Sequence, residues 1–363
     1  MPIGHLKVQV HTGEDALPVE NANVLIKDAF GRVLYNLTTD NSGNTQSVEL
    51  YAPDKSHDLS PDDPGPYYGI YDVEIRKPNF ITQIIRGVQI FDGIDSYLPI
   101  NLLPSPSPDQ DLVNVTYIPP NNLHSSEPRP QPGPEGPAYS TYQGENRNGF
   151  TPQDNVDSPR ESRVLPAVIV PDYITVHLGT PSNTAARNVR VRFIDYIKNV
   201  ASSEIYPDWP DNALRANIHA IVTFALNRIY TEWYRSRGQN FDITNSTAYD
   251  MAYVENRNIF QNISNIVDEV FNVYARRIGF QDPFFTEFCN GSTAKCNGMS
   301  QWGTVTLAKQ GLNPLQILRA YYPRDLELVR TNNVGPVQES YPGSPLSIRK
   351  QWPKCEENAG LFK

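Results

Sequence analysis

Hydrophobic and polar residues alternate in the N-terminal part of the chain. The alternation is clearest over Leu6–Val10, Val24–Ile26 and Tyr71–Ile75, and turn-forming residues such as Asp40–Asn44 separate these stretches. A period of two is typical of strands that bury one face, and several short strands at such spacing indicate a sandwich. We therefore predict that residues 1–103 form an all-β sandwich domain with antiparallel strands.

Helical periodicity dominates the chain beyond residue 166. After Pro210 and Asp211, which suit a helix start, one continuous apolar stripe follows with the spacing of a helix face; it comprises Leu214, Ile218, Ile221, Val222, Ala225 and Ile229. Further helices are predicted over Ile259–Tyr274 and, interrupted near Gly311–Pro314, over Val305–Tyr321. Strand-like runs such as Ile174–Leu178 precede them. The pattern predicts an α+β domain over residues 166–330 and a C-terminal tail over residues 331–363.

Proline separates the two predicted domains. Ten prolines lie within residues 104–137, and the residues that follow are mostly polar. Proline-rich chain of this kind is extended, semi-rigid and unable to build a core. We therefore predict a Pro-rich linker over residues 104–165.

Composition and charge narrow the class of protein. The chain has 363 residues, enough for two domains, with 39% hydrophobic and 20% charged residues, as in soluble globular proteins. A net charge of −9 argues against nucleic acid as a partner, because phosphate binding needs a surplus of Lys and Arg. No apolar run is long enough for a membrane span. The first residues, Met1–His5, show neither the basic nor the apolar region of a secretory signal peptide.

Glu204 is the first candidate for chemistry. It stands near Tyr206 and Trp209, just before the Pro-rich turn that leads into the long predicted helix. A carboxyl group among aromatic side chains is poorly solvated and can hold a proton near neutrality, as a general acid must. The alternative is a solvated acid at a helix start, which is the commoner role of such a residue.

A second candidate segment lies about a hundred residues further along the chain. Glycines flank Ser300, Gln301 and Trp302, so the backbone, the polar groups and the indole face could contact a sugar. The alternative is a turn followed by a packed helix.

Together the two segments resemble the SpoIID/LytB family. The first reads Val200-Ala201-Ser202-Ser203-Glu204, and the second reads Gly298-Met299-Ser300-Gln301-Trp302-Gly303 followed by Ala308-Lys309-Gln310-Gly311. The stretches 227–235 and 241–247 are similar to the SleC-type subgroup of spore cortex-lytic enzymes. The resemblance covers roughly residues 165–330, and residues 1–103 look like a sandwich of the carboxypeptidase-regulatory or prealbumin-like type.

The resemblance implies a peptidoglycan lytic transglycosylase that cleaves MurNAc–GlcNAc bonds and leaves 1,6-anhydro-muramoyl ends. Its implied partners are peptidoglycan glycan strands and an activating protease, its place is the spore coat, the cortex or the cell wall, and no cofactor is expected. Glu204 is the implied catalytic residue. The implied substrate-binding residues are Ser203, Tyr206, Trp209, Arg215, Ser300, Gln301 and Trp302.

The chain also departs from the family pattern. No His follows His219, so Cys289 and Cys296 cannot complete a zinc site; a local disulfide or two free thiols is expected. Val222 stands where the family helix has an Arg, whose role is then missing or moved to a residue such as Arg228. A glycan-binding protein without turnover is the alternative function, and a precursor cut around Arg160–Arg163 is a third possibility.

Overall fold

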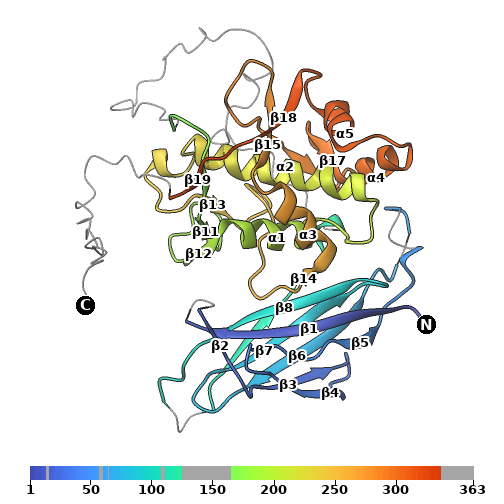
Figure 1. Cartoon of the computed structure of the whole chain (residues 1–363), viewed down its shortest axis with the longest axis vertical. Helices are drawn as coiled ribbons and strands as arrows, with labels where there is room; N and C mark the ends of the chain where they lie inside the picture. The colour runs from blue at the N-terminus through green and yellow to red at the C-terminus, as the bar shows by residue number, and fades with distance from the viewer. Residues whose placement is uncertain (14–15, 57–59, 64, 108–110, 125–164, 337–363) are drawn as a thin grey trace, which may run out of the picture.

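The computed structural model describes residues 1–13, 16–56, 60–63, 65–107, 111–124 and 165–336. They form an N-terminal region of strands and a mixed domain of helices and short strands, which lie one above the other in Figure 1. Within this part of the chain, no helix combines the length and the apolar composition needed to cross a membrane.

The N-terminal region consists of two sheets that face each other. One contains β1 (Ile3–Thr12), β2 (Leu17–Pro18), β5 (Val48–Tyr51) and β8 (Asp95–Leu102). The other has the order β4 (Val33–Thr38), β3 (Asn23–Lys27), β6 (Gly69–Arg76), β7 (Thr82–Ile90), β9 (Val113–Tyr117). Alternate residues of both sheets, such as Val8 and Val73, are completely buried in one shared core. We call this region the sandwich.

Two strand pairs of the sandwich differ from the expected antiparallel pattern. β1 pairs with β8 in parallel, and β7 pairs with β9 in parallel. Both pairs join strands that are far apart in sequence, so the turn signals between neighbouring strands could not indicate them. The sandwich is therefore mixed rather than antiparallel throughout.

The sequence places β9 inside the predicted linker. Residues 113–117 instead extend a sheet of the sandwich, and η2 (Asn122–His124) follows directly. Leu123 is buried in the core of the mixed domain. The chain from 113 to 124 is therefore packed structure, and the rest of the predicted linker, residues 125–164, lies outside the described residues.

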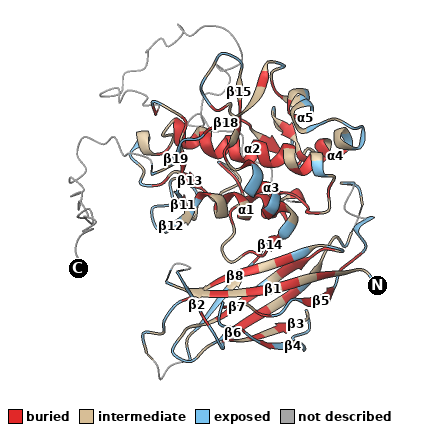
Figure 2. Ribbon diagram, viewed as in Figure 1, coloured by how far each residue is buried: buried red, intermediate tan, exposed pale blue. Residues whose placement is uncertain are grey.

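The mixed domain surrounds one long central helix. Its helices are α1 (Phe193–Glu204), α2 (Asp211–Tyr230), α3 (Gln261–Val270), α4 (Gln301–Lys309) and α5 (Pro314–Tyr321). Its strands are β10 (Val170–Pro171), β11 (Tyr173–His177), β12 (Asn188–Arg192), β13 (Ile243–Thr244), β14 (Ile259–Phe260), β15 (Val273–Arg277), β16 (Phe288–Cys289), β17 (Met299–Ser300), β18 (Leu326–Arg330) and β19 (Val334–Gly335). α2 contacts the other four helices and β15, so it is buried on nearly all sides rather than along one stripe (Figure 2).

Two elements of this domain differ from the sequence prediction. Helix α1 occupies a segment for which no helix is predicted, although Phe193, Ile197 and Val200 have helical spacing and are buried. β19 lies in the predicted tail and pairs with β10, so the domain extends to at least residue 335. Residues 337–363 lie outside the described residues.

The two regions share a sheet. β14 of the mixed domain pairs antiparallel with β8 of the sandwich, through Ile259 with Tyr97 and Phe260 with Ser96 (Figure 1). The ring of Phe91 packs against Phe260 with 5.1 Å between centroids. Backbone pairing and aromatic packing thus fix the sandwich against the side of the mixed domain that carries α1 and α3.

Candidate active site

Glu204 is the last residue of α1 and is completely buried. Three donors from three segments converge on its carboxylate. The Ala252 backbone N–H donates to Oε1 at 2.8 Å, Asn122 Nδ2 donates to Oε2 at 3.0 Å, and Gln301 Nε2 reaches Oε2 at 3.3 Å. These contacts fix the orientation of the carboxylate. Glu204 is therefore not a solvated acid at a helix start, which was the alternative interpretation of this residue.

The fold brings the two candidate segments together. Besides the carboxylate, Gln301 Nε2 also donates to the backbone oxygen of Glu204, across 97 residues of sequence. The ring of Trp302 packs on Trp209 with 5.0 Å between centroids and on Tyr206 with 6.0 Å. Glu204 and four of the seven predicted substrate-binding residues therefore form one buried cluster. Its aromatic rings are packed in the core and present no open face in the described structure.

The other three predicted substrate-binding residues make contacts within the protein. Ser203 Oγ donates to the backbone oxygen of Asn199, one turn earlier in α1. Ser300 caps α4, where its Oγ accepts the N–H of Gly303. Arg215 forms ion pairs of 2.7 Å with Asp211 and Glu269 at the surface.

The glycines around Ser300 have packing roles. A Cβ on Gly298 would lie 1.8 Å from the backbone oxygen of Glu287, and one on Gly303 would lie 2.0 Å from the Tyr321 hydroxyl oxygen. The close approach that these glycines permit is therefore to the protein itself.

Cys289 and Cys296 form a disulfide in the loop before β17. Cys289 also pairs with Ser300 across β16 and β17, so the disulfide loop leads directly into the segment that carries Gln301. Among the described residues, no group of three or more His, Cys, Asp and Glu side chains could hold a metal ion.

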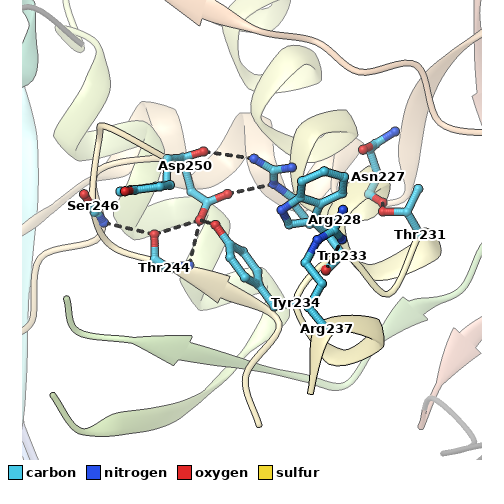
Figure 3. Close-up of polar contacts among 10 residues, drawn as sticks. Asn227, Arg228, Thr231, Trp233, Tyr234, Arg237, Thr244, Ser246 and Asp250 are labelled. Carbon is cyan, nitrogen blue, oxygen red and sulfur yellow. Dashed lines mark hydrogen bonds and ion pairs between the residues drawn. The ribbon is translucent and has the colours of Figure 1, made fainter. Parts of the chain in front are cut away.

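Arg228, to which the role of the family arginine could have moved, is held in a buried ion pair. Figure 3 shows its guanidinium beside Asp250, with 2.7 Å between Nε and Oδ1. Asp250 Oδ2 also accepts the Tyr234 hydroxyl and both the backbone N–H and the hydroxyl of Thr244. Burial, together with the nearby Asp250 carboxylate, raises the pKa of Tyr234. Arg228 is thus a structural partner of Asp250.

This network anchors the loop that carries Ala252. Asp250 ties one end of the loop to α2 through Arg228. On the other side, Asn199 of α1 exchanges two hydrogen bonds with the backbone of Val254, of 2.7 and 2.9 Å. Ala252 lies between these two attachments, so its N–H points at Glu204 from a fixed position. The sequence pattern carried no signal for this loop.

The sandwich covers Glu204 from the side of β7 and η2. Asn121 Nδ2 donates to the backbone oxygen of Ile205 at 3.4 Å, next to the Asn122 contact. Tyr67 and Phe91 pack on the ring of Tyr206, with centroid distances of 5.5 and 5.3 Å. Residues from the other predicted domain and from the predicted linker therefore form one wall of the site, which no pattern within residues 166–330 could indicate.

A buried arginine lies in the same interface. Arg257 Nη2 donates to Gln89 Oε1 of β7 at 2.5 Å. Burial lowers the pKa of Arg257 to about 10, and the charges of Tyr68, Glu204 and Tyr206 oppose this shift. Arg257 therefore remains protonated at neutral pH. It was not a predicted site residue.

A cavity of about 230 Å³ lies at the opposite end of the pair of helices α1 and α2. Its lining includes Tyr173, Arg190, Arg228 and Trp233, but neither Glu204 nor any of the seven predicted substrate-binding residues. The cavity is lined by Arg228 and Ile229 near the C-terminal end of α2, whereas Glu204 precedes the N-terminal end of that helix.

No curated protein matches the chain. Solved structures with a likeness include the Bacillus anthracis TIE protein, the Klebsiella pneumoniae 5-hydroxyisourate hydrolase and GBS52, the minor pilin of Streptococcus agalactiae. Their sequence identities are 13%, 18% and 14%, and their TM-scores are 0.20, 0.19 and 0.21. In the same order, the matched regions cover 28%, 28% and 30% of this chain and 16%, 91% and 48% of the length of those proteins. TM-scores this low indicate neither a shared fold nor a shared function.

A family comparison bears on the site itself. Residues 182–272 match the model of the SpoIID family, described as Stage II sporulation protein. The matched stretch contains Glu204, the loop of Ala252 and Arg257, and it ends before Gln301. The match supports placing this part of the chain in the SpoIID family.

Proposed function

We propose that this chain is a peptidoglycan lytic transglycosylase that cleaves MurNAc–GlcNAc bonds of spore cortex or denuded glycan, with Glu204 as its acid/base catalyst. One observation carries the proposal: Gln301, from the second motif of the resemblance, binds both the backbone oxygen and the carboxylate of Glu204, from the first. The SpoIID match over residues 182–272 supports a role in cell-wall degradation during sporulation.

The proposed reaction needs one carboxyl group that acts twice. Protonated Glu204 donates its proton to the glycosidic oxygen as the bond from C1 of MurNAc breaks. The carboxylate then takes the proton of the C6 hydroxyl, whose oxygen bonds to C1 and closes the 1,6-anhydro ring. The enzyme ends in its starting protonation state and no water is consumed, so the second carboxylate of ordinary glycosidases is not required. Ala252 and Gln301 hold Glu204 in position through both steps.

Substrate access requires displacement of the sandwich. Glu204 is completely buried, and Asn122 occupies one of its carboxylate oxygens. We propose that the described structure is a covered precursor and that an activating protease separates the two regions. A cut around Arg160–Arg163 would fall among residues 125–164, outside the described part of the chain.

Product analysis tests the activity. Wild-type protein and Glu204→Gln are incubated with purified cortex and with denuded glycan, with and without limited proteolysis, and the products are identified by mass spectrometry. We expect anhydro-muropeptides from the cut wild type and a loss of at least about 100-fold in Glu204→Gln, because positioned proton transfer supplies about 10²–10⁴ in rate. Undiminished activity of Glu204→Gln would overturn the role of Glu204. Products with reducing ends would indicate a muramidase instead.

A glycan-binding protein without turnover is the second candidate. The complete burial of Glu204 under a well-packed interface favours it. In that case, both the wild type and Glu204→Gln would bind sedimented glycan, and neither would release products after proteolysis.

A further inference from the structure

Arg257 is a buried cation with few acceptors. Its side chain is only 1% exposed, yet Gln89 Oε1 is the one hydrogen-bond acceptor that the guanidinium has among the described residues. Its Nε–H is buried and has no hydrogen-bond partner within that part of the chain. A guanidinium carries five N–H donors, and buried arginines are ordinarily paired. An unpaired buried cation is costly, so a functional reason for its place is expected.

The guanidinium belongs to the surroundings of Glu204. Arg257 follows Ala252 by five residues on the segment that lies beside α1, and the charge of Glu204 acts on its pKa. Its guanidinium carbon lies 6.0 Å from the ring of Phe260, which packs on Phe91, and Phe91 packs on Tyr206. Arg257 and Glu204 are thus covered by the same face of the sandwich.

The groups that cover the two charges have the same chemistry. Gln89 offers a carboxamide oxygen to Arg257, and Asn122 offers a carboxamide N–H to Glu204. A carboxamide carbonyl and the acetamido carbonyl of an N-acetylated sugar are equivalent acceptors. Gln89 is itself held in place, because its Nε2 donates to the backbone oxygen of Pro119 and its backbone N–H and oxygen both bind Asn258.

We propose that Arg257 is a substrate-binding residue that binds the acetamido carbonyl oxygen of an N-acetylated sugar, in the place that Gln89 takes in the covered structure. The assignment rests on the proposed function of the Glu204 site. The acceptor that Arg257 has in the covered structure is the neutral carbonyl oxygen of Gln89, and an acetamido carbonyl oxygen is a neutral acceptor of the same kind.

The test follows the side-chain Nε–H of Arg257 by NMR in the full chain carrying Glu204→Gln, after the limited proteolysis that uncovers the site. This variant should bind without turnover. The probes are a tetramer of N-acetylglucosamine and the matched tetramer of glucosamine, whose amino groups lack the acetyl carbonyl. Arg257→Lys assigns the resonance. We expect a shift with the acetylated tetramer alone, and tighter binding when Gln89→Ala removes the competing carboxamide.

Affinity measurements complete the test. Arg257→Gln should weaken binding of the acetylated tetramer about 10- to 100-fold, as expected for the loss of a hydrogen bond from a charged group. The matched control is Arg276→Gln. Arg276 lies on β15 and forms an ion pair with Glu327 of β18, so this variant should bind the acetylated tetramer with unchanged affinity. Tryptophan fluorescence verifies that each variant is folded.

The outcomes separate this inference from the proposed function. The inference is overturned if the acetylated tetramer leaves the Arg257 resonance unchanged both with Gln89 present and with Gln89→Ala. It is also overturned if Arg257→Gln binds this tetramer as tightly as the protein that retains Arg257. If the resonance shifts but the cut wild type releases no product, the inference stands and catalysis is refuted. If the cut wild type makes anhydro products and Arg257→Gln makes them with unchanged kcat and KM, only the inference fails.

Discussion

Three donors from separate segments hold the Glu204 carboxylate, and each has its own support. Gln301 begins α4 and follows the disulfide loop, Asn122 follows β9, and Ala252 lies on the loop that Asp250 anchors. Glu204 and Gln301 are indicated by the sequence because they lie in recognisable motifs. Ala252 acts through its backbone N–H, which every residue except proline offers, so no side-chain pattern could mark it.

Replacement of Asp250 tests the support of Ala252. Asp250→Asn keeps the shape of the side chain but leaves Arg228 as a buried charge without its counterion, so we expect a loss of about 3–5 kcal/mol in the free energy of unfolding. Urea denaturation followed by tryptophan fluorescence measures this, because three of the four tryptophans, Trp209, Trp233 and Trp302, lie in the mixed domain. Glu255→Gln, which removes a more exposed partner of Arg187 near the same loop, should cost about 1 kcal/mol or less. Equal effects of the two changes would contradict a structural role of the Arg228–Asp250 pair.

Helix α2 shows how burial replaces the expected amphipathic pattern. The sequence indicates one apolar stripe, but polar residues of this helix such as Asn217, His219 and Thr223 are buried as well. Each has a partner in the surrounding elements or in the helix itself; Asn217 Nδ2, for example, donates to Thr304 of α4 at 2.8 Å. Such hydrogen bonds lower the cost of burying these polar groups, although Asn217 Oδ1 has no partner within the described part of the chain.

His219 makes the stability of this helix depend on pH. Burial lowers its pKa to about 4, from about 6.5 in an unfolded chain. Between these values the unfolded chain binds a proton that the folded chain does not, so stability is complete above pH 6.5 and falls as the pH decreases toward 4. At pH 5 the effect is about 2 kcal/mol.

The measurement compares the wild type with His219→Leu in urea at pH 7 and pH 5, so that other titrating groups cancel. The wild type should lose about 2 kcal/mol more than the variant between these two pH values. Identical losses would show that His219 is protonated without penalty in the folded state.

At the scale of the whole molecule, the sandwich and the mixed domain share one interface. The pairing of β8 with β14, the contact of Asn256 with Thr116 and the rings of Phe91 and Tyr206 all join the two regions. Phe91 belongs to the core of the mixed domain although it follows a strand of the sandwich. The interface therefore covers Glu204 as a packed wall.

Loosening this interface should uncover the site without proteolysis. Phe91→Ala removes the ring that contacts Tyr206 and Phe260, at a cost of about 3–5 kcal/mol. We expect the uncut variant to release products from denuded glycan while the uncut wild type releases none. Ile26→Ala, in the sandwich core on β3, which among the described residues pairs only with β4 and β6, is the control for general destabilisation and should stay inactive. An uncut wild type as active as Phe91→Ala would refute the covering role of the sandwich.

Local patterns determined the class of each region. A period of two indicates the strands around Val8 and Val73, and a helical period indicates α2, because the backbone geometry alone sets which residues share a face. Order along the chain also singled out Glu204 and Gln301 as candidates. Helix α1 had the same kind of signal at Phe193, Ile197 and Val200, and it could have been predicted.

Only the tertiary structure decided what surrounds Glu204. Parallel pairing of β7 with β9 places Asn122 on its carboxylate, and pairing of β8 with β14 places Arg257 beneath Gln89. These contacts join residues that are far apart in sequence, and their energies depend on packing and desolvation across an interface rather than on local propensity. The sequence by itself thus determined the strands, the central helix and the catalytic candidate, whereas the cover over that candidate and the buried cation beside it exist only in the folded chain.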